Sequence, residues 1–176
     1  MKADLSYDVY LLSEIDMEQL KNAAEHGDAE SQCALGYCYE NGLHVEKDEV
    51  QALELYKASA AQNCSNGIYN VGIFTGWGKG GAERSPRKYF EYIKRAAEMG
   101  FAPAQNDLGW CYEEGIKHDC IDYVDVELAF AWYMKSAMQG HSTGITNVIR
   151  CYREGIGVQQ DEDEARHWEN GGHCCG

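Results

Sequence analysis

The sequence has no long hydrophobic run, little proline and few basic residues. No stretch approaches the roughly 18 consecutive apolar residues of a membrane-spanning helix. Residues 1–8 lack the apolar core of a signal peptide, so we expect a cytoplasmic protein without membrane contact. With two prolines and no Ser/Pro/Gly-rich linker, the 176 residues are expected to form a single domain.

The shortage of basic residues bears on the choice of partner. Lys and Arg total 15 against 29 Asp and Glu, giving a formal net charge of −14. This balance argues against nucleic acid, which requires a basic footprint. It is compatible with a basic protein or peptide partner, but a strong net charge also simply keeps a protein soluble.

A glycine-terminated motif recurs four times along the chain. In its first copy it reads Leu35-Gly36-Tyr37-Cys38-Tyr39-Glu40-Asn41-Gly42. The closing glycines are Gly42, Gly78, Gly115 and Gly155, separated by steps of 36, 37 and 40 residues. A period in this range is typical of a solenoid built from helical repeats.

The apolar spacing predicts two helices in each repeat. We place the repeats at 28–63, 64–100, 101–140 and 141–176, preceded by an N-terminal cap over 1–27 that holds half a repeat. The predicted start signals are Ser13 for the cap helix, Asp48, Ser85-Pro86 and Asp161 for second helices, and Pro103 in a first turn. Gly36, Gly72 and Gly109 each cost a helix about 1 kcal/mol relative to alanine, so we expect close helix packing there.

The eight cysteines do not predict a disulfide framework, because that inference requires a secreted context. Cys38, Cys111 and Cys151 occupy one column of the repeat, where Phe74 stands in repeat two, and are predicted to be buried core residues. The His118–Cys120 loop and the His173-Cys174-Cys175 tail lack the spacing of an EF-hand or a Cys-x-x-Cys zinc site. We therefore predict no metal and no cofactor.

The segment Trp77-Gly78-Lys79-Gly80-Gly81 is rich in glycine, as phosphate-binding loops are. It lacks the glycine five residues before Gly78 and the Ser or Thr after Lys79 that a P-loop requires. A flexible loop of the repeat is the simpler interpretation. The six histidines show no pairing with a nucleophile and an orienting carboxylate, so we predict no active site.

The residues that recur at equivalent positions of the four repeats resemble the Sel-one-like repeat family, whose members are short relatives of tetratricopeptide repeats. The matching signature in repeat one is Leu35, Gly36, Tyr39, Gly42, Asp48, Ala52, Tyr56, Ala60 and Asn63. In repeat three it is Leu108, Gly109, Tyr112, Gly115, Asp125, Ala129, Tyr133, Ala137 and Gly140. Repeat two departs with Thr75 and Tyr89, and repeat four with Ile149 in place of the glycine. The likeness covers about residues 14–170.

The resemblance implies an all-α, right-handed α/α superhelix of about four helix-turn-helix repeats with an N-terminal capping helix. It also implies a protein-interaction scaffold whose first helices line a concave surface. Cysteine-rich members of the family staple adjacent repeats with disulfides. Cys64 has no such partner among Ser59, Ala60 and Ala61, which argues against that subclass.

Helical spacing gives the residues that we expect on the concave surface. They are Cys33, Tyr37, Glu40, Tyr69, Ile73, Trp77, Asn106, Trp110, Glu113, Thr146, Arg150 and Arg153. The stripe is aromatic in the first three repeats and basic in the last, and both residue types often carry interface energy. We expect a groove for an extended or helical segment of another protein. The alternative is that Tyr37, Tyr69 and Trp110 pack inside the superhelix.

The sequence therefore favours a non-catalytic adaptor that binds another protein. An inhibitor or immunity-type protein that blocks a partner enzyme is the first alternative. A small metal- or thiol-dependent enzyme using the loop and tail cysteines, and a self-associating structural module, are the others. The sequence names neither the partner nor the oligomeric state.

Overall fold

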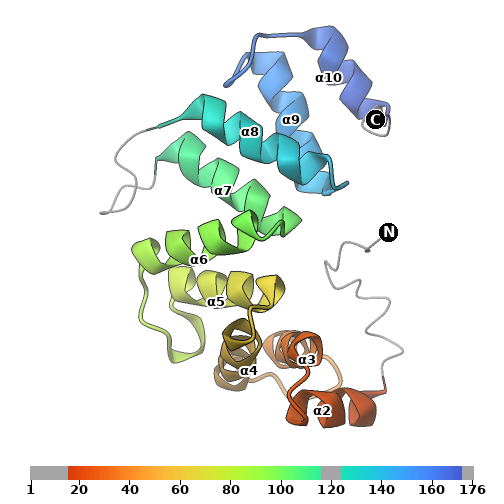
Figure 1. Ribbon diagram of the computed structural model, residues 1–176, viewed down its shortest axis with the longest axis vertical. Helices are drawn as coiled ribbons and strands as arrows, with labels where there is room; N and C mark the ends of the chain where they lie inside the picture. Colours follow the sequence, from red (N-terminus) through yellow and green to blue (C-terminus); the bar gives the residue numbers. More distant parts are fainter. Residues whose placement is uncertain (1–15, 116–123, 172–176) are drawn as a thin grey trace. The chain divides into compact units, whose positions relative to one another are not determined.

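The computed structural model describes residues 16–115 and 124–171 (Figure 1). These residues form nine α-helices and one short 3-10 helix, and no strand occurs among them. The all-α prediction is therefore confirmed. The described residues divide into two compact units, one of residues 16–96 and one of residues 97–115 and 124–171. We call them the N-terminal unit and the C-terminal unit.

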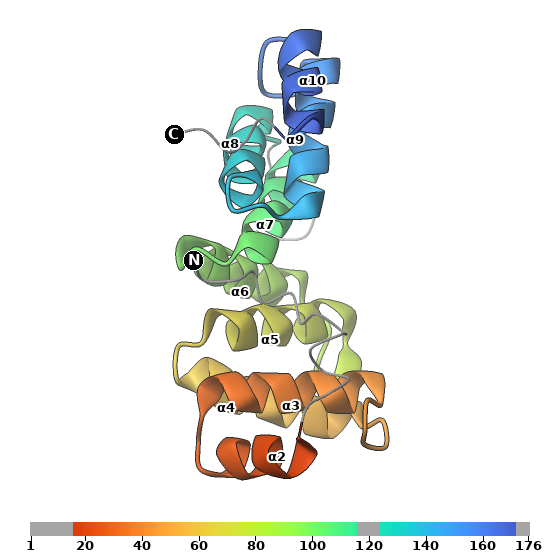
Figure 2. The same cartoon turned by 90° about the vertical axis from the view of Figure 1, so that its right-hand side faces the viewer.

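The helices of the N-terminal unit follow one another in short steps along the chain. They are α2 (Met17–Glu25), α3 (Ala29–Asn41), α4 (Glu49–Ala61), α5 (Ser65–Trp77), the 3-10 helix η1 (Lys79–Gly81) and α6 (Pro86–Glu98), whose last two residues belong to the other unit. Helix α3 packs against both α2 and α4, and α4 packs against α5 (Figure 2). The predicted half-repeat cap is thus α2, which covers the first complete helix pair.

The C-terminal unit holds two more helix pairs. They comprise α7 (Ala102–Glu114) with α8 (Val126–Ala137), and α9 (Ser142–Glu154) with α10 (Glu162–Glu169). Helix α8 packs between α7 and α9, and α9 packs against α10. In each unit, therefore, the second helix of one repeat is covered by the first helix of the next, as stacking of repeats requires.

The second helices begin where the sequence predicts. The carboxylates of Asp48, Asp125 and Asp161 cap α4, α8 and α10 by accepting hydrogen bonds from backbone amides of the first turn. Pro86 is the first residue of α6, and Pro103 lies in the first turn of α7. The start signals at Asp48, Ser85-Pro86, Pro103 and Asp161 are therefore confirmed.

The predicted start of the cap helix at Ser13 is wrong. Helix α2 begins at Met17 with Asp16 as its N-cap, and the Asp16 carboxylate accepts hydrogen bonds from the amides of Glu18 and Gln19. Two hydrogen bonds to an ionised group stabilise a helix start more than one hydroxyl does. Ser13 itself lies outside the described residues.

The core lies between the helices of each pair. Cys38, Phe74, Cys111 and Cys151 are all completely buried, which confirms the predicted core column. A Cβ atom on Gly36 would lie 2.9 Å from the ring of Tyr56, and one on Gly109 would lie 2.7 Å from the ring of Tyr133. A Cβ on Gly72 would meet Tyr92 at 2.9 Å. These glycines are therefore required by close helix contact, as predicted.

Repeat four tolerates Ile149 at the glycine position because its second helix lacks the large ring. The position equivalent to Tyr56 and Tyr133 holds Glu169, which is exposed and forms an ion pair with Arg153. Ile149 instead packs against the cluster that contains Trp168. The substitution in α9 is thus matched by one in α10.

Candidate protein-interaction site

The twelve predicted surface residues fall on the first helices α3, α5, α7 and α9, but their exposure differs widely. Trp77 and Trp110 are the most prominent, with 70% and 49% of their surface exposed. Thr146 and Arg153 are also exposed. The half-buried members are Tyr37, Glu40, Tyr69, Ile73, Glu113 and Arg150.

Cys33 and Asn106 are buried, with 0% and 7% of their surface exposed, so they offer no surface to a partner. Each is covered by an asparagine from the first helix of the next repeat. The side-chain amide of Asn70 lies 3.5 Å from the Cys33 sulfur, and that of Asn147 donates a hydrogen bond of 2.8 Å to Asn106 Oδ1. Helical spacing within one repeat does not reveal this cover, because it comes from the neighbouring repeat.

The carboxylate of Glu113 is held by two neighbours inside the C-terminal unit. It accepts a hydrogen bond of 2.7 Å from the Tyr133 hydroxyl. Both terminal nitrogens of Arg150 donate to its two oxygens, at 2.8 and 2.6 Å. Such a bidentate pair is among the stronger polar contacts in proteins. Arg150, which the sequence places on the binding surface, is therefore engaged within the chain.

The protonation of this cluster follows from its contacts. The Arg150 guanidinium holds the pKa of Glu113 below its usual range, although partial burial opposes that shift. Burial and the adjacent Glu113 carboxylate raise the pKa of Tyr133. At neutral pH the carboxylate is ionised and the phenol protonated, so the three groups form a fixed structural contact and not a proton-transfer site.

The N-terminal unit contains the corresponding cluster with a different cation. Glu40 accepts a hydrogen bond of 2.9 Å from the Tyr56 hydroxyl and forms an ion pair of 3.1 Å with Lys79. Lys79 also lies over the ring of Phe74, 5.5 Å from its centroid. The lysine of the glycine-rich segment is therefore paired with a carboxylate of the chain itself.

The basic character predicted for repeat four is largely neutralised. Arg153 forms ion pairs with Glu169 at 2.6 Å and with Glu162 at 3.7 Å. Arg150 is paired with Glu113, as described above. The large hydrophobic side chains that the first helices leave exposed are Trp77 in the N-terminal unit and Trp110 in the C-terminal unit, within the described residues.

Within each unit, two consecutive repeats pack against each other, and we call this contact the repeat junction. Its residues recur in the two units 77 positions apart. The equivalent pairs are Tyr56 with Tyr133, Ser59 with Ser136, Gly67 with Gly144, Asn70 with Asn147 and Gly80 with Gly157. In both units the serine hydroxyl donates a 2.7 Å hydrogen bond to a carbonyl at the start of the first helix. The chain thus has a double-repeat period in addition to its single-repeat period.

The glycine-rich segment is packed at this junction. It forms the 3-10 turn η1, which lies against α4. A Cβ atom on Gly80 would overlap with the carbonyl oxygen of Glu49, and one on Gly157 would overlap with that of Val126. The prediction of a flexible loop is therefore wrong, because the glycine allows the loop backbone to approach the preceding repeat.

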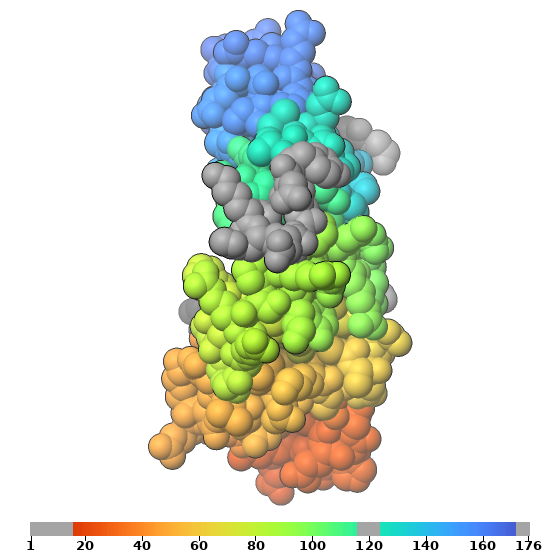
Figure 3. Space-filling view, turned by 90° about the vertical axis from the view of Figure 1, so that its left-hand side faces the viewer, coloured from red at the N-terminus to blue at the C-terminus, as the bar shows by residue number. Residues whose placement is uncertain are grey.

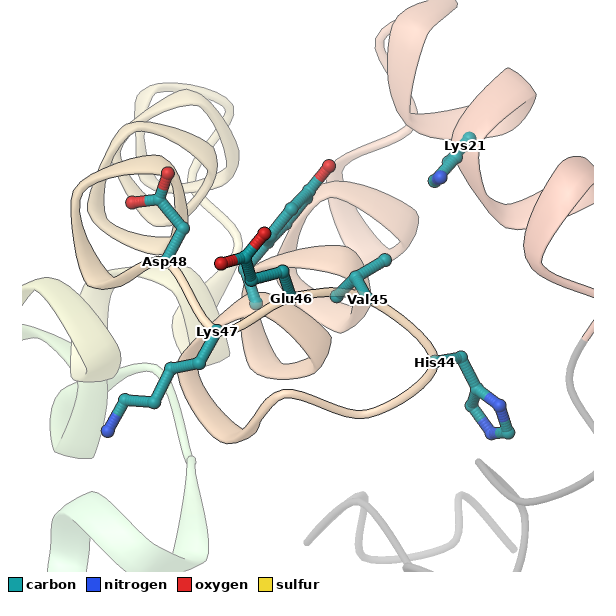
Figure 4. A pocket seen from close by; sticks show the side chains of 7 residues that line it. Lys21, His44, Val45, Glu46, Lys47 and Asp48 are labelled. Atoms are coloured by element: carbon teal, nitrogen blue, oxygen red, sulfur yellow. The ribbon is translucent and has the colours of Figure 1, made fainter.

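A pocket of about 590 Å³ lies between α2 and the loop that joins α3 to α4 (Figure 4). Its lining comprises Lys21, Tyr39, His44, Val45, Glu46, Lys47 and Asp48. Figure 4 shows Lys47 and His44 pointing away from each other. Lys47 forms an ion pair with Glu49, and Asp48 caps α4. These charged groups do not converge on a common point, so the pocket does not have the arrangement of an active site.

Two further predictions concern metals and membranes. Within residues 16–115 and 124–171, no three His, Cys, Asp or Glu side chains form a group able to hold a metal ion. The candidates His118, Cys120 and the His173-Cys174-Cys175 tail lie outside that part of the chain. In the same ranges, no helix combines the length and the hydrophobicity needed to span a membrane.

The Sel1 repeat family matches this chain at residues 29–64, 65–101, 102–141 and 147–168. The chain belongs to the Sel1 repeat family. The first three matches begin at the first residue of α3, α5 and α7 and end three or four residues after α4, α6 and α8, and the fourth runs from within α9 to within α10. The Sel1 repeats of this chain thus correspond to the four helix pairs.

Two solved Sel1 repeat structures resemble this one. A Sel1 repeat protein from Oxalobacter formigenes is 30% identical with a TM-score of 0.74, over 86% of this chain and 42% of that one. The protective antigen c5321 of uropathogenic Escherichia coli strains is 33% identical with a TM-score of 0.75, over 89% of this chain and 32% of that one. The predicted helical-repeat fold is therefore confirmed.

The curated relatives are fungal regulators. The chitin synthase regulator SKT5 of Saccharomyces cerevisiae is 27% identical over 154 residues, 83% of this chain and 22% of the relative. Chitin synthase regulatory factor 3 of Schizosaccharomyces pombe is 29% identical over 164 residues, 89% of this chain and 17% of the relative. The Sel1 chain thus spans about a fifth of the length of these relatives.

Proposed function

We propose that this chain is a non-catalytic adaptor or regulatory module that binds a segment of another protein on the exposed face of its first helices. Its Sel1 repeats and its likeness to proteins named as chitin synthase regulators support a role in protein interaction. Because the chain spans only about a fifth of those relatives, the proposal concerns the repeat module itself.

The observation that carries the proposal is the exposure of Trp77 and Trp110. Tryptophan is the residue most enriched among interface hot spots, and a folded monomer gains nothing from exposing its large ring. Tyr69 and Ile73 precede Trp77 on α5 at spacings of eight and four residues, which places all three along one side of that helix. The partner segment of the N-terminal unit therefore meets an aromatic and aliphatic stripe.

The charges on the same helices shape what the partner can be. Glu40, Glu113 and Arg150 satisfy one another or nearby side chains within their own units. Recognition at these helices then depends on apolar contact more than on charge. The acidic balance of the whole chain still favours a partner segment with basic residues nearby, through longer-range attraction.

The test begins with capture of the partner from the native host by the immobilised chain. Trp77→Ala and Trp110→Ala are then compared with wild type in binding to the purified partner. Each is expected to weaken binding by about 2 kcal/mol, roughly 30-fold in Kd. Circular dichroism should be unchanged, because 70% of the Trp77 surface and about half of the Trp110 surface are exposed.

Met138→Ala is the matched control. Met138 lies at the end of α8, a second helix, and is as exposed as Trp77, at 70%. Equal loss of binding in Met138→Ala, or full binding in the double tryptophan variant, would overturn the proposal. If the captured partner is an enzyme, its activity with and without the chain distinguishes an adaptor from an inhibitor.

A further inference from the structure

One segment of this acidic chain has the opposite charge. Residues 79–95 contain six of the 15 basic residues and two of the 29 acidic ones, a net charge of +4. The remaining nine basic and 27 acidic residues give the rest of the chain a net charge of −18. The net charge of the whole chain therefore does not show that this segment is basic.

Five of the six cations are exposed. They are Arg84, Arg87, Lys88, Lys94 and Arg95, which we call the basic surface. The opposite side of α6 carries Ile93 and Ala96, which are completely buried. Figure 3 shows residues 79–95, in the yellow-green part of the colour bar, on the surface of the face in view. All five cations belong to the N-terminal unit.

The contacts of Arg87 and Arg95 leave the charge of these two side chains largely uncompensated. Arg87 forms an ion pair of 3.1 Å with Glu91, but both side chains are more than half exposed, so the pair contributes little. Arg95 donates a hydrogen bond of 2.6 Å to the neutral side-chain oxygen of Asn63. The stability of α6 therefore does not explain why cations are gathered there.

The charges at the start of α6 oppose the usual preference of helix N-termini. Helix N-termini favour acidic side chains and disfavour basic ones. The first turns of α2, α3, α4, α8 and α10 contain at least one acidic residue, and those of α5, α7 and α9 contain none. The first turn of α6 contains no acidic residue but holds Arg87 and Lys88, with Arg84 just before it. These cations are unfavourable at that end of a helix, which argues for a use outside folding.

We propose that the basic surface binds a short acidic segment of a partner protein. Arg87 and Lys94 are seven residues apart on one side of α6, as are Lys88 and Arg95, a rise of about 10 Å in each case. An extended peptide covers that distance in about three residues. The segment that fits carries Asp or Glu at about every third position. This surface is independent of the aromatic stripe on the first helices.

A protein segment suits this surface better than a long polyanion. Screening at about 0.1 M salt confines electrostatic attraction to about 10 Å, so a short peptide meets mainly the local cations. A nucleic acid or an anionic membrane extends beyond the patch and meets the repulsion of a surface with a net charge of −18. The small size of a peptide therefore favours it over a nucleic acid or a membrane as the ligand of the basic surface.

The experiment measures fluorescence anisotropy of a labelled peptide of about twelve residues, with Glu at every third position and Ser between, bound to the full chain. A peptide with Gln in place of Glu is the ligand control. The test variant is Arg84→Gln with Lys88→Gln. The matched control is Lys21→Gln with Lys135→Gln, which lowers the net charge equally but lies outside the basic surface.

We expect the wild-type chain to bind the Glu peptide, and to bind it more weakly as salt is raised. Kd should rise about fivefold in Arg84→Gln/Lys88→Gln and less than about twofold in the control variant. Absence of binding by the wild type, or equal weakening in both variants, would overturn the proposal. So would tighter binding of phosphatidylserine vesicles or of single-stranded oligothymidine than of the Glu peptide.

Discussion

Replacement of Gly80 by alanine tests whether the glycine-rich segment is a packed part of the repeat junction. Gly80 and Gly81 are adjacent in the 3-10 turn and both have positive φ, +58° and +80°. A Cβ on Gly80 would overlap with the carbonyl oxygen of Glu49 and lie 3.2 Å from Leu53 Cβ. A Cβ on Gly81 would meet nothing within 4 Å. The two positions therefore share a left-handed backbone conformation and differ in how closely they are packed.

The expected magnitudes follow from this difference. A left-handed conformation costs alanine about 1 kcal/mol relative to glycine, and this cost applies to both variants. Overlap with neighbouring atoms adds about 2 kcal/mol for Gly80→Ala, because a carbonyl of α4 cannot rotate away as a side chain does. We expect the free energy of unfolding to fall by about 3 kcal/mol in Gly80→Ala and by about 1 kcal/mol in Gly81→Ala.

Urea denaturation followed by circular dichroism measures both values. At an m value of about 2 kcal/mol per M, the midpoints of the two variants should differ by about 1 M urea. Because the units can unfold in separate steps, the comparison applies to the transition in which the N-terminal unit unfolds. Trp110, Trp132 and Trp168 lie in the C-terminal unit, so a background with these three replaced by Phe reports the transition of the N-terminal unit through Trp77.

The C-terminal unit provides a second, independent comparison. Gly157 has φ of +66° and its Cβ would overlap with the carbonyl oxygen of Val126, whereas Gly140, with φ of +84°, has open space around it. Gly157→Ala should therefore destabilise its unit more than Gly140→Ala does. Equal effects within both pairs of variants would refute the argument that close backbone approach selects these glycines.

Two other predictions concern titratable groups. Because Arg150 lowers the pKa of Glu113 in the folded state, that contact stabilises the protein above the unfolded pKa of about 4.3 and loses its effect as pH falls through the folded value. Urea denaturation at a series of acidic pH values should therefore show a shallower pH dependence for Glu113→Gln than for wild type, and identical curves would contradict the reasoning. Burial raises the pKa of Cys151 to about 11, while Cys64 is partly exposed, so iodoacetamide at about pH 8 should alkylate Cys64 and spare Cys151 in the native protein. Peptide mass spectrometry measures the two extents, and similar labelling would show that the core column opens readily.

Much of the fold was predictable because each repeat must bury the same face against its neighbours. Gly36, Gly109 and the cysteine column recur at fixed spacing, so their packing roles are visible in the linear sequence. Asp48 and Asp161 were predictable as caps because an N-cap acts on amides two or three residues away. These features depend on local spacing, which the linear sequence displays directly.

The surface was harder to predict because it depends on contacts between repeats. Cys33 is covered by Asn70, 37 residues later, and Arg150 reaches back 37 residues to Glu113. A helical wheel of one repeat places these side chains on the outside, because it does not include the residues of the adjacent repeat that contact them. The 77-residue recurrence of Asn70 at Asn147 was the one available signal.

The sequence by itself thus determined the helical repeat and its core columns, because these follow from short-range periodicity. Only the tertiary structure decided which charges are neutralised, why Gly80 and Gly157 are needed, and which aromatic side chains remain exposed. These properties depend on how one repeat stacks on the next, and that stacking brings together residues that lie dozens of positions apart. The exposure of Trp77 and Trp110, on which the proposed binding site rests, is one of these properties.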